Sequence, residues 1–272
     1  MNENARIAFI GGGNMASALI GGLIRTGYPP RNLLAVEIDA ARRASLARDF
    51  GIAVAPAPDA QLARFDVLVL AVKPQQMQEV CSALRPFVGE QLVLSIAAGI
   101  RIAHLTRWLG TGRIVRSMPN TPALIGRGIS GLVAAASVTP AQRELAAQIL
   151  QAVGTVVWFD DESQLDAVTA ISGSGPAYVF YFIEALIQAG RDMGLTDEQS
   201  RRLAIETLVG ASHLAAESGE SPETLRARVT SKGGTTAAAI GSMDADQIKA
   251  KIVAAVRAAQ RRASEMGDEF GK

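Results

Sequence analysis

The chain has 272 residues, which exceeds the usual size of one domain and leaves room for about two. Its 27 basic and 26 acidic side chains give a formal net charge of +1, so no strong field is available to recruit nucleic acid or an anionic membrane surface. With 49% hydrophobic and 5% aromatic residues, the composition excludes a disordered or fibrous chain and predicts aliphatic globular cores.

The chain has one cysteine, Cys81, so it cannot form an internal disulfide. This favours a reducing compartment. It lies in an apolar pattern with helical spacing, which predicts burial rather than catalysis. Residues 1–6 are polar and lack the apolar core of a signal peptide, and no unbroken apolar run approaches the roughly 18 residues of a membrane span. We therefore expect a soluble, cytoplasmic protein without nucleic-acid or membrane partners.

Short apolar runs that predict buried strands alternate with helical patterns in the first part of the chain. This alternation is typical of a mostly parallel sheet with helices on both faces, so we predict an α/β, Rossmann-type domain over residues 1–160. Strands are expected at 6–10, 33–36, 67–72, 92–97, 114–118, 131–134 and 155–159, and helices after residue 13, at 40–50, at 75–84 and after Pro140.

Helical patterns alone follow, and they predict an all-α domain over residues 161–272. The helix expected around 177–189 carries Tyr178, Phe180, Tyr181 and Phe182 and is apolar around much of its circumference, which favours homodimerisation through these helices. The alternative to homodimerisation is a self-contained helical bundle with a large hydrophobic core. The expected helices are 164–171, 176–193, 197–218, 222–229 and 244–266.

The glycine-rich turn 11–16 follows the first expected strand and matches the pattern G-x-G-x-x-A. Gly11 permits the tight turn, Gly13 lets the backbone approach a pyrophosphate, and Ala16 permits close helix packing. The helix that follows offers unpaired N–H groups and a positive dipole to phosphates. The turn therefore predicts a dinucleotide site.

Glu37 ends the second expected strand, where a carboxylate could accept hydrogen bonds from an adenosine ribose and would favour NAD. Arg42 and Arg43 argue for NADP, because either could pair with a 2′-phosphate, although both could simply solvate an exposed helix face. These residues leave the choice between NAD and NADP open.

Three further segments, 71–75, 95–99 and 118–122, follow later strands at the crevice where such sheets bind ligands. Lys73 is expected to contact the cofactor, and the polar groups between Pro119 and Pro122 are expected near the nicotinamide. The candidate cofactor-binding residues are Ile10, Gly11, Gly12, Gly13, Asn14, Met15, Ala16, Glu37, Arg42, Ala71, Val72, Lys73, Pro74, Ala97, Gly99 and Asn120.

Two more glycine-bearing turns, 172–176 and 230–236, each open a helix in the second half. The second could hold a small carboxylate through backbone N–H groups and the hydroxyls of Ser231, Thr235 and Thr236. Plain helix capping is the alternative role.

The scarcity of histidine limits the kinds of reaction that the chain could catalyse. The two histidines, His104 and His213, lie on helical stretches, so neither a metal cluster nor a catalytic triad is expected. The crevice offers mainly hydroxyl and backbone groups, which suits a substrate that is already electrophilic.

In the glycine-rich turns and strand-end segments described above, the chain resembles the pyrroline-5-carboxylate reductases, and the resemblance extends over about residues 6–266. The resemblance implies a Rossmann domain, an intertwined helical dimer that can assemble into larger rings such as a decamer of five dimers, and hydride transfer from NADPH, less often NADH, to the cyclic imine 1-pyrroline-5-carboxylate, giving L-proline. The matching segments are 10–16, 71–75, 95–99, 118–122, 172–178 and 230–236.

The resemblance also implies roles for individual residues. Thr236 would bond the ring nitrogen as the catalytic residue, and the 231–235 turn would hold the substrate carboxylate beside the nicotinamide. Glu37 departs from the small polar residue that many members carry, because its carboxylate would repel a 2′-phosphate. The candidate substrate-binding residues are Ser174, Gly175, Pro176, Ser231, Gly233, Gly234, Thr235 and Thr236.

Two other functions use the same fold. A related imine reductase or 3-hydroxy-acid dehydrogenase would need a lysine or another acid on the interdomain helix, and residues 177–191 contain no lysine. A non-catalytic NADP-binding regulator is the second alternative, because a fold alone does not fix a function. The intact substrate turns argue against it.

Overall fold

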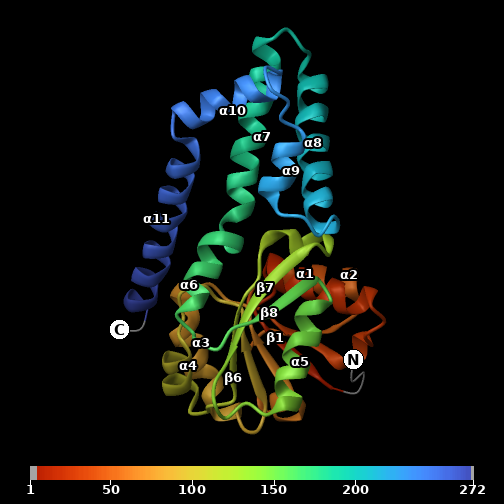
Figure 1. Ribbon diagram of the computed structural model, residues 1–272. Coiled ribbons are helices and arrows are strands. Elements are labelled where there is room, and N and C mark those ends of the chain that lie inside the picture. The colour runs from red at the N-terminus through yellow and green to blue at the C-terminus, as the bar shows by residue number, and fades with distance from the viewer. Residues whose placement is uncertain (1–4, 271–272) are drawn as a thin grey trace. The chain divides into compact units, whose positions relative to one another are not determined.

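The structure is a computed structural model that describes residues 5–270 (Figure 1). The chain forms two compact units, one made of residues up to Ser174 together with those from Ala259 onward, and one made of Gly175–Ala258. The last strand ends at Trp158, and the first unit continues through a short helical segment to Ser174. The expected division at residue 160 stays a prediction.

The first unit is built on one sheet, with the strand order β3-β2-β1-β4-β5-β6-β7-β8 among the described residues. Strands β1 to β6 are mutually parallel and follow the Rossmann order, whereas β7 runs antiparallel to β6. The predicted fold class is confirmed. The strands are β1 Ile7–Ile10, β2 Leu33–Val36, β3 Ala53–Ala55, β4 Val67–Leu70, β5 Leu92–Ser95, β6 Ile114–Met118, β7 Gly128–Ala134 and β8 Gly154–Trp158.

The strands β1, β2 and β4 are buried on both faces of the sheet, which explains why they are apolar throughout. Ile7 and Phe9 of β1 enter one core cluster, while Ala8 and Ile10 enter the other. The covering helices are α1 Asn14–Arg25, α2 Ala40–Phe50, α3 Met77–Leu84, α4 Ile102–Leu109 and α5 Pro140–Gln151. Cys81 of α3 is fully buried, as its sequence pattern predicted.

A helical segment leads out of the sheet and into the second unit. α6 Gln164–Val168 passes into a π-helical turn at Thr169–Gly173 and then into α7 Gly175–Asp192. α8 Asp197–Glu217 begins with a capping box between Thr196 and Gln199. α9 Pro222–Arg228, α10 Thr235–Ala245 and α11 Ile248–Glu269 complete the helices.

The expectation of one helix over 244–266 is wrong. α10 ends at Ala245, the backbone of Gln247 has a φ of 55°, and α11 starts at Ile248. A residue with positive φ cannot continue an α-helix, so the chain turns at this point.

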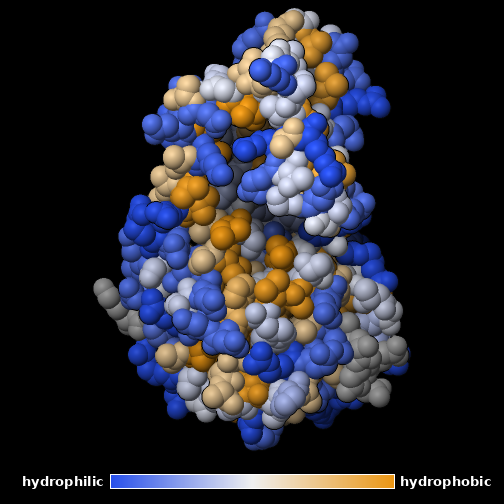
Figure 2. All heavy atoms as spheres, in the orientation of Figure 1, coloured by the Kyte–Doolittle hydropathy of each residue, from blue (hydrophilic) through white to orange (hydrophobic). Residues whose placement is uncertain are grey.

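Large apolar side chains remain exposed on α7. Val179, Phe180, Tyr181 and Phe182 have exposed fractions between 42% and 76%. Ile129 of β7 and Val157 of β8 are also exposed, and Figure 2 shows hydrophobic atoms over these strands. Exposed apolar surface of this kind marks an interaction surface.

The helical stretch Gln164–Asp192 is long and apolar enough to cross a membrane by length and composition. The stretch is not an unbroken apolar run, because it contains Asp166, Glu184, Arg191 and Asp192. A helix that packs against another subunit can have the same length and composition.

Candidate active site

The glycine-rich turn packs tightly between β1 and α1. Gly11 has a φ of +97°, and a Cβ placed on it would lie 2.7 Å from the carbonyl oxygen of Ala71, so only glycine fits. A Cβ on Gly12 would lie 2.5 Å from Cδ1 of Leu46. No side chain caps α1 at Gly13, and its first N–H groups can therefore receive an anion. This cradle fits a dinucleotide pyrophosphate.

A cleft of about 360 Å³ opens beside the turn. It is lined by residues at the carboxyl ends of β1, β2 and β4. Eight of the candidate cofactor residues line it: Ile10, Gly11, Gly12, Gly13, Glu37, Ala71, Val72 and Lys73. The candidates outside this lining are Asn14, Met15, Ala16, Arg42, Pro74, Ala97, Gly99 and Asn120.

Sequence reasoning missed several residues of this cleft. Ile38 follows Glu37 and Gln76 follows the segment 71–75, so the neighbouring motifs are a sequence signal for both residues. Pro58 lies in a loop that carries no recognisable motif. The additional lining residues are Val36, Ile38, Pro58, Gln76, Glu79, Val80 and Ala83.

Two candidates outside the cleft have structural contacts of their own. The side chain of Asn120 donates to the carbonyl oxygen of Ser172 at 3.2 Å and accepts from the N–H of Ile129 at 3.0 Å. Gly99 has a φ of +74°, and a Cβ on it would lie 3.1 Å from the ring of Phe270. Asn120 therefore ties the loop after β6 to the π-helical turn.

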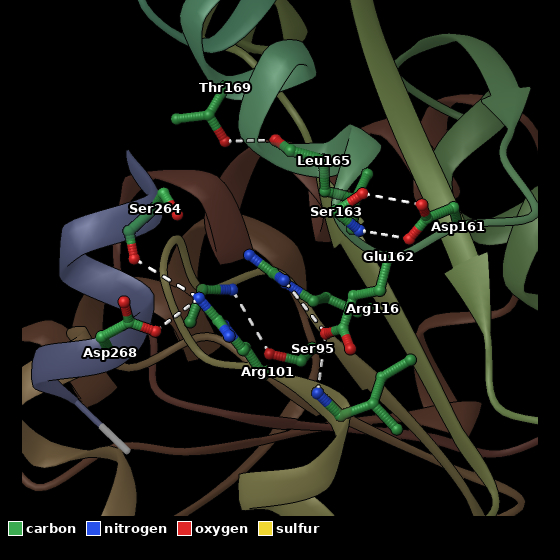
Figure 3. A network of polar contacts seen from close by, with 12 residues as sticks. Ser95, Arg101, Arg116, Asp161, Glu162, Ser163, Leu165, Thr169, Ser264 and Asp268 are labelled. Atoms are coloured by element: carbon green, nitrogen blue, oxygen red, sulfur yellow. Dashed lines mark hydrogen bonds and ion pairs between the residues drawn. The ribbon is translucent and has the colours of Figure 1, made fainter. Parts of the chain in front are cut away.

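Two ion pairs near the loop after β5, one of them with a buried arginine, were not predicted. Arg116 of β6 is 4% exposed and pairs with Glu162 at 3.0 Å. Arg101 pairs with Asp268 at 2.7 Å, and Figure 3 shows Arg101 directed toward the C-terminal helix that carries Asp268. These partners are far apart in sequence, and no local pattern marks them.

The candidate substrate turn lies in the second unit. Gly233 has a φ of +75°, and the N–H of Gly234 donates to the carbonyl oxygen of Ser231 at 3.1 Å. No side chain caps α10 at Gly234, so the first turn of this helix keeps donors for a small anion. Thr235 and Thr236 supply hydroxyls in that turn.

The candidate turn 172–176 joins the two units along the chain. The N–H of Ser174 donates to the carbonyl oxygen of Thr169 at 2.8 Å and closes the π-helical turn. Gly175 and Pro176 then begin α7.

The groups with shifted pKa values lie outside the glycine-rich turn 11–16 and outside the candidate substrate turn 231–236. Burial, followed by the charge of Arg107, lowers the pKa of His104, and burial raises the pKa of Asp166. Burial alone raises the pKa of Cys81 to about 12, which opposes a nucleophilic role. Within residues 5–270, no group of three His, Cys, Asp or Glu side chains could hold a metal ion.

Comparison with known proteins gives matches over nearly the whole chain. Residues 162–266 match the pyrroline-5-carboxylate reductase dimerisation family, and residues 6–99 match the family described as NADP oxidoreductase coenzyme F420-dependent. A pyrroline-5-carboxylate reductase from Pseudomonas aeruginosa is 49% identical over 98% of both chains.

Solved structures agree with these matches. A pyrroline-5-carboxylate reductase from Coxiella burnetii has a TM-score of 0.91 and 39% identity and covers 96% of this chain and 98% of its own. A pyrroline carboxylate reductase from Plasmodium falciparum with NADP bound has a TM-score of 0.87 and 31% identity, over 97% of this chain and 99% of its own.

The Rossmann sheet, the glycine cradle and the helical second unit define an NAD(P)H-dependent oxidoreductase that forms a homo-oligomer. Identity of 49% over nearly the full length specifies the family. The chain belongs to the pyrroline-5-carboxylate reductase family, as its motifs predicted.

Proposed function

We propose that this protein reduces 1-pyrroline-5-carboxylate to L-proline in the cytoplasm, as the last step of proline biosynthesis, with NADPH or NADH as the cofactor. The observation that carries the proposal is the 49% identity, over 98% of both chains, to a pyrroline-5-carboxylate reductase. The relative with NADP bound supports NADPH, whereas Glu37 in the cleft supports NADH.

The glycine turn and the cleft beside it form the proposed cofactor site. The dinucleotide, when bound, supplies a hydride. Gly11, Gly12 and Gly13 let the backbone approach the pyrophosphate, and the uncapped first turn of α1 offers it N–H donors. Val72 and Lys73 line the same cleft. The other cofactor candidates, including Asn120, stay predictions.

The 231–236 turn forms the proposed substrate site. Backbone N–H groups at Gly233, Gly234 and Thr235 and the hydroxyl of Ser231 would hold the carboxylate, and the hydroxyl of Thr236 would bond the ring nitrogen. Ser174, Gly175 and Pro176 would shape the start of α7 around the ring. A protonated imine is electrophilic, so these residues need to position it rather than to supply a strong acid.

A second copy of the chain is the proposed cover for the exposed apolar side chains of α7. The match of residues 162–266 to a dimerisation family supports this assignment over a membrane span. The assembly would be a homodimer, and the decamer of five dimers implied by the resemblance is a further proposal.

The proposed reaction is tested by following oxidation of NADPH and of NADH with pyrroline-5-carboxylate, with 3-keto acids and with no substrate. The proposal predicts oxidation that depends on the imine. Oxidation with 3-keto acids alone would favour the dehydrogenase alternative, and tight cofactor binding without any turnover would favour the regulator.

A further inference from the structure

Glu37 is held in one position at the wall of the cofactor cleft. Its Oε2 accepts the N–H of Gly12 at 2.8 Å, and its Oε1 accepts the N–H of Asp39 at 2.9 Å. Its own N–H donates to the carbonyl oxygen of Ala55 at 2.9 Å. Each carboxylate oxygen can accept a further hydrogen bond, so Glu37 presents two fixed acceptors to a ligand.

Among the described residues, the nearby cations do not form an ion pair with this carboxylate. Arg42 donates through Nε to the carbonyl oxygen of Gly12 and through Nη2 to Oδ1 of Asn14. Arg43 donates to the carbonyl oxygens of Glu37 and of the residue after it. Across residues 5–270, neither arginine forms an ion pair with Glu37, and neither lines the cleft.

The charges that do line the cleft are Glu37, Glu79 and Lys73. A 2′-phosphate carries about −1.5 to −2 charges at pH 7, and next to a fixed carboxylate it would be repelled. The two hydroxyls of an unphosphorylated ribose are donors that match the two free acceptor positions of Glu37.

We propose that Glu37 binds the 2′- and 3′-hydroxyls of the adenosine ribose and makes this chain select NADH over NADPH, in contrast to the NADPH that the family resemblance implies. The proposal rests on the proposed function only in that a nicotinamide dinucleotide is the cofactor. Glu37 acts here as a specificity residue for the cofactor.

The test is an equilibrium titration of the full-length protein with NADH and with NADPH in the absence of the imine. Isothermal titration calorimetry measures the two dissociation constants. The wild-type protein should bind NADH with a Kd at least about tenfold lower than its Kd for NADPH. Glu37→Gln keeps an acceptor for the N–H of Gly12 but removes the charge, and it should shift the ratio of the two constants toward NADPH by about tenfold. Glu37→Ser should shift the ratio further.

Two matched variants on the same cleft wall sharpen the test. Glu79→Gln also removes one negative charge, and it should change the ratio much less than Glu37→Gln does. Lys73→Gln should leave the preference for NADH in place. A selective loss of NADPH binding in Lys73→Gln would show that this lysine receives a 2′-phosphate and would overturn the proposal.

Three other results would overturn it. These are equal or tighter binding of NADPH by the wild-type protein, an unchanged ratio in both Glu37 variants, and an equal shift in Glu79→Gln. Failure of the proposed reaction would look different, since NADH would bind selectively but would not be oxidised when pyrroline-5-carboxylate is added.

Discussion

Buried Arg116 pairs with partly exposed Glu162, and Nη1 of the arginine lies 3.0 Å from Oε1 of the glutamate (Figure 3). The same Oε1 accepts the N–H of Ile102 at 2.7 Å, at the start of α4. Glu162 therefore joins β6, α4 and the segment before α6 through one carboxylate. Its loss would leave a buried guanidinium and a helix N–H group without a partner.

Glu162→Ala should consequently lower the free energy of unfolding by about 3 kcal/mol, because removing the partner of the buried arginine leaves an uncompensated charge. Urea denaturation measures this change. Glu90→Ala is the control, since it breaks the pair between Arg113 and a glutamate that is 89% exposed and should cost less than about 1 kcal/mol. Equal losses in the two variants would contradict the structural role of Glu162.

Gly11→Ala should abolish measurable dinucleotide binding, since the new Cβ would lie 2.7 Å from the carbonyl oxygen of Ala71 and force the turn to move. Gly27→Ala is the matched control. Gly27 has a φ of +92° but no atom within 4 Å of an added Cβ, so that substitution should cost about 1 kcal/mol in stability and leave binding intact. Retained binding in Gly11→Ala would remove the turn from the site.

Thr236→Ala should lower kcat/KM for the imine by roughly tenfold or more while the Kd for the dinucleotide stays the same, if its hydroxyl orients the ring nitrogen. Thr236→Ser keeps a hydroxyl and should recover most of the activity. Steady-state kinetics and cofactor titration separate the two effects. If Thr236→Ala kept the wild-type kcat/KM, Thr236 would have no catalytic role.

Alkaline pH should destabilise the protein through Cys81. Burial raises the pKa of this thiol from 9.0 to about 12 in the folded protein, so only the unfolded chain ionises it between those values. The stability is therefore fully present below pH 9 and falls as the pH rises toward 12, by about 2 kcal/mol at pH 10.5. Cys81→Ala should lose that much less stability between pH 8 and pH 10.5, and an identical loss would show that the thiol does not contribute.

Phe180→Glu should dissociate the homo-oligomer, since Phe180 is 58% exposed on α7 and a charge there would be buried by the proposed partner copy. Sedimentation velocity measures the change in mass. Gln188→Glu is the control, because it adds the same charge to an exposed polar position of α7 and should leave the assembly intact. An unchanged oligomer in Phe180→Glu would place the interface on other residues.

The sequence was sufficient for most of the first unit, because strands buried on both faces are continuously apolar. β2 and β6 have the predicted bounds, and α2 spans 40–50 as expected. β3 was not assigned, since Ala53–Ala55 is a three-residue edge strand and its first two residues are not buried. An edge strand of that kind lacks the apolar run on which the assignment depends.

The contacts that join distant segments could not be read from local patterns. Arg116 and Glu162 are 46 residues apart, and Asn120 and Ser172 are 52 apart. The π-helical turn at Thr169–Gly173 also has no motif of its own, because its apolar spacing resembles an ordinary α-helix. Such features follow from tertiary packing, which propensity alone does not encode.

The proposed reaction delivers a hydride from a nicotinamide dinucleotide to a cyclic imine. The most direct measurement is mass spectrometry of the product after incubation with pyrroline-5-carboxylate and a dinucleotide carrying deuterium at the transferable position of its nicotinamide. We predict proline with one deuterium on the former imine carbon. Recovery of the imine unchanged, or of proline without deuterium, would contradict hydride transfer to the imine carbon by this protein.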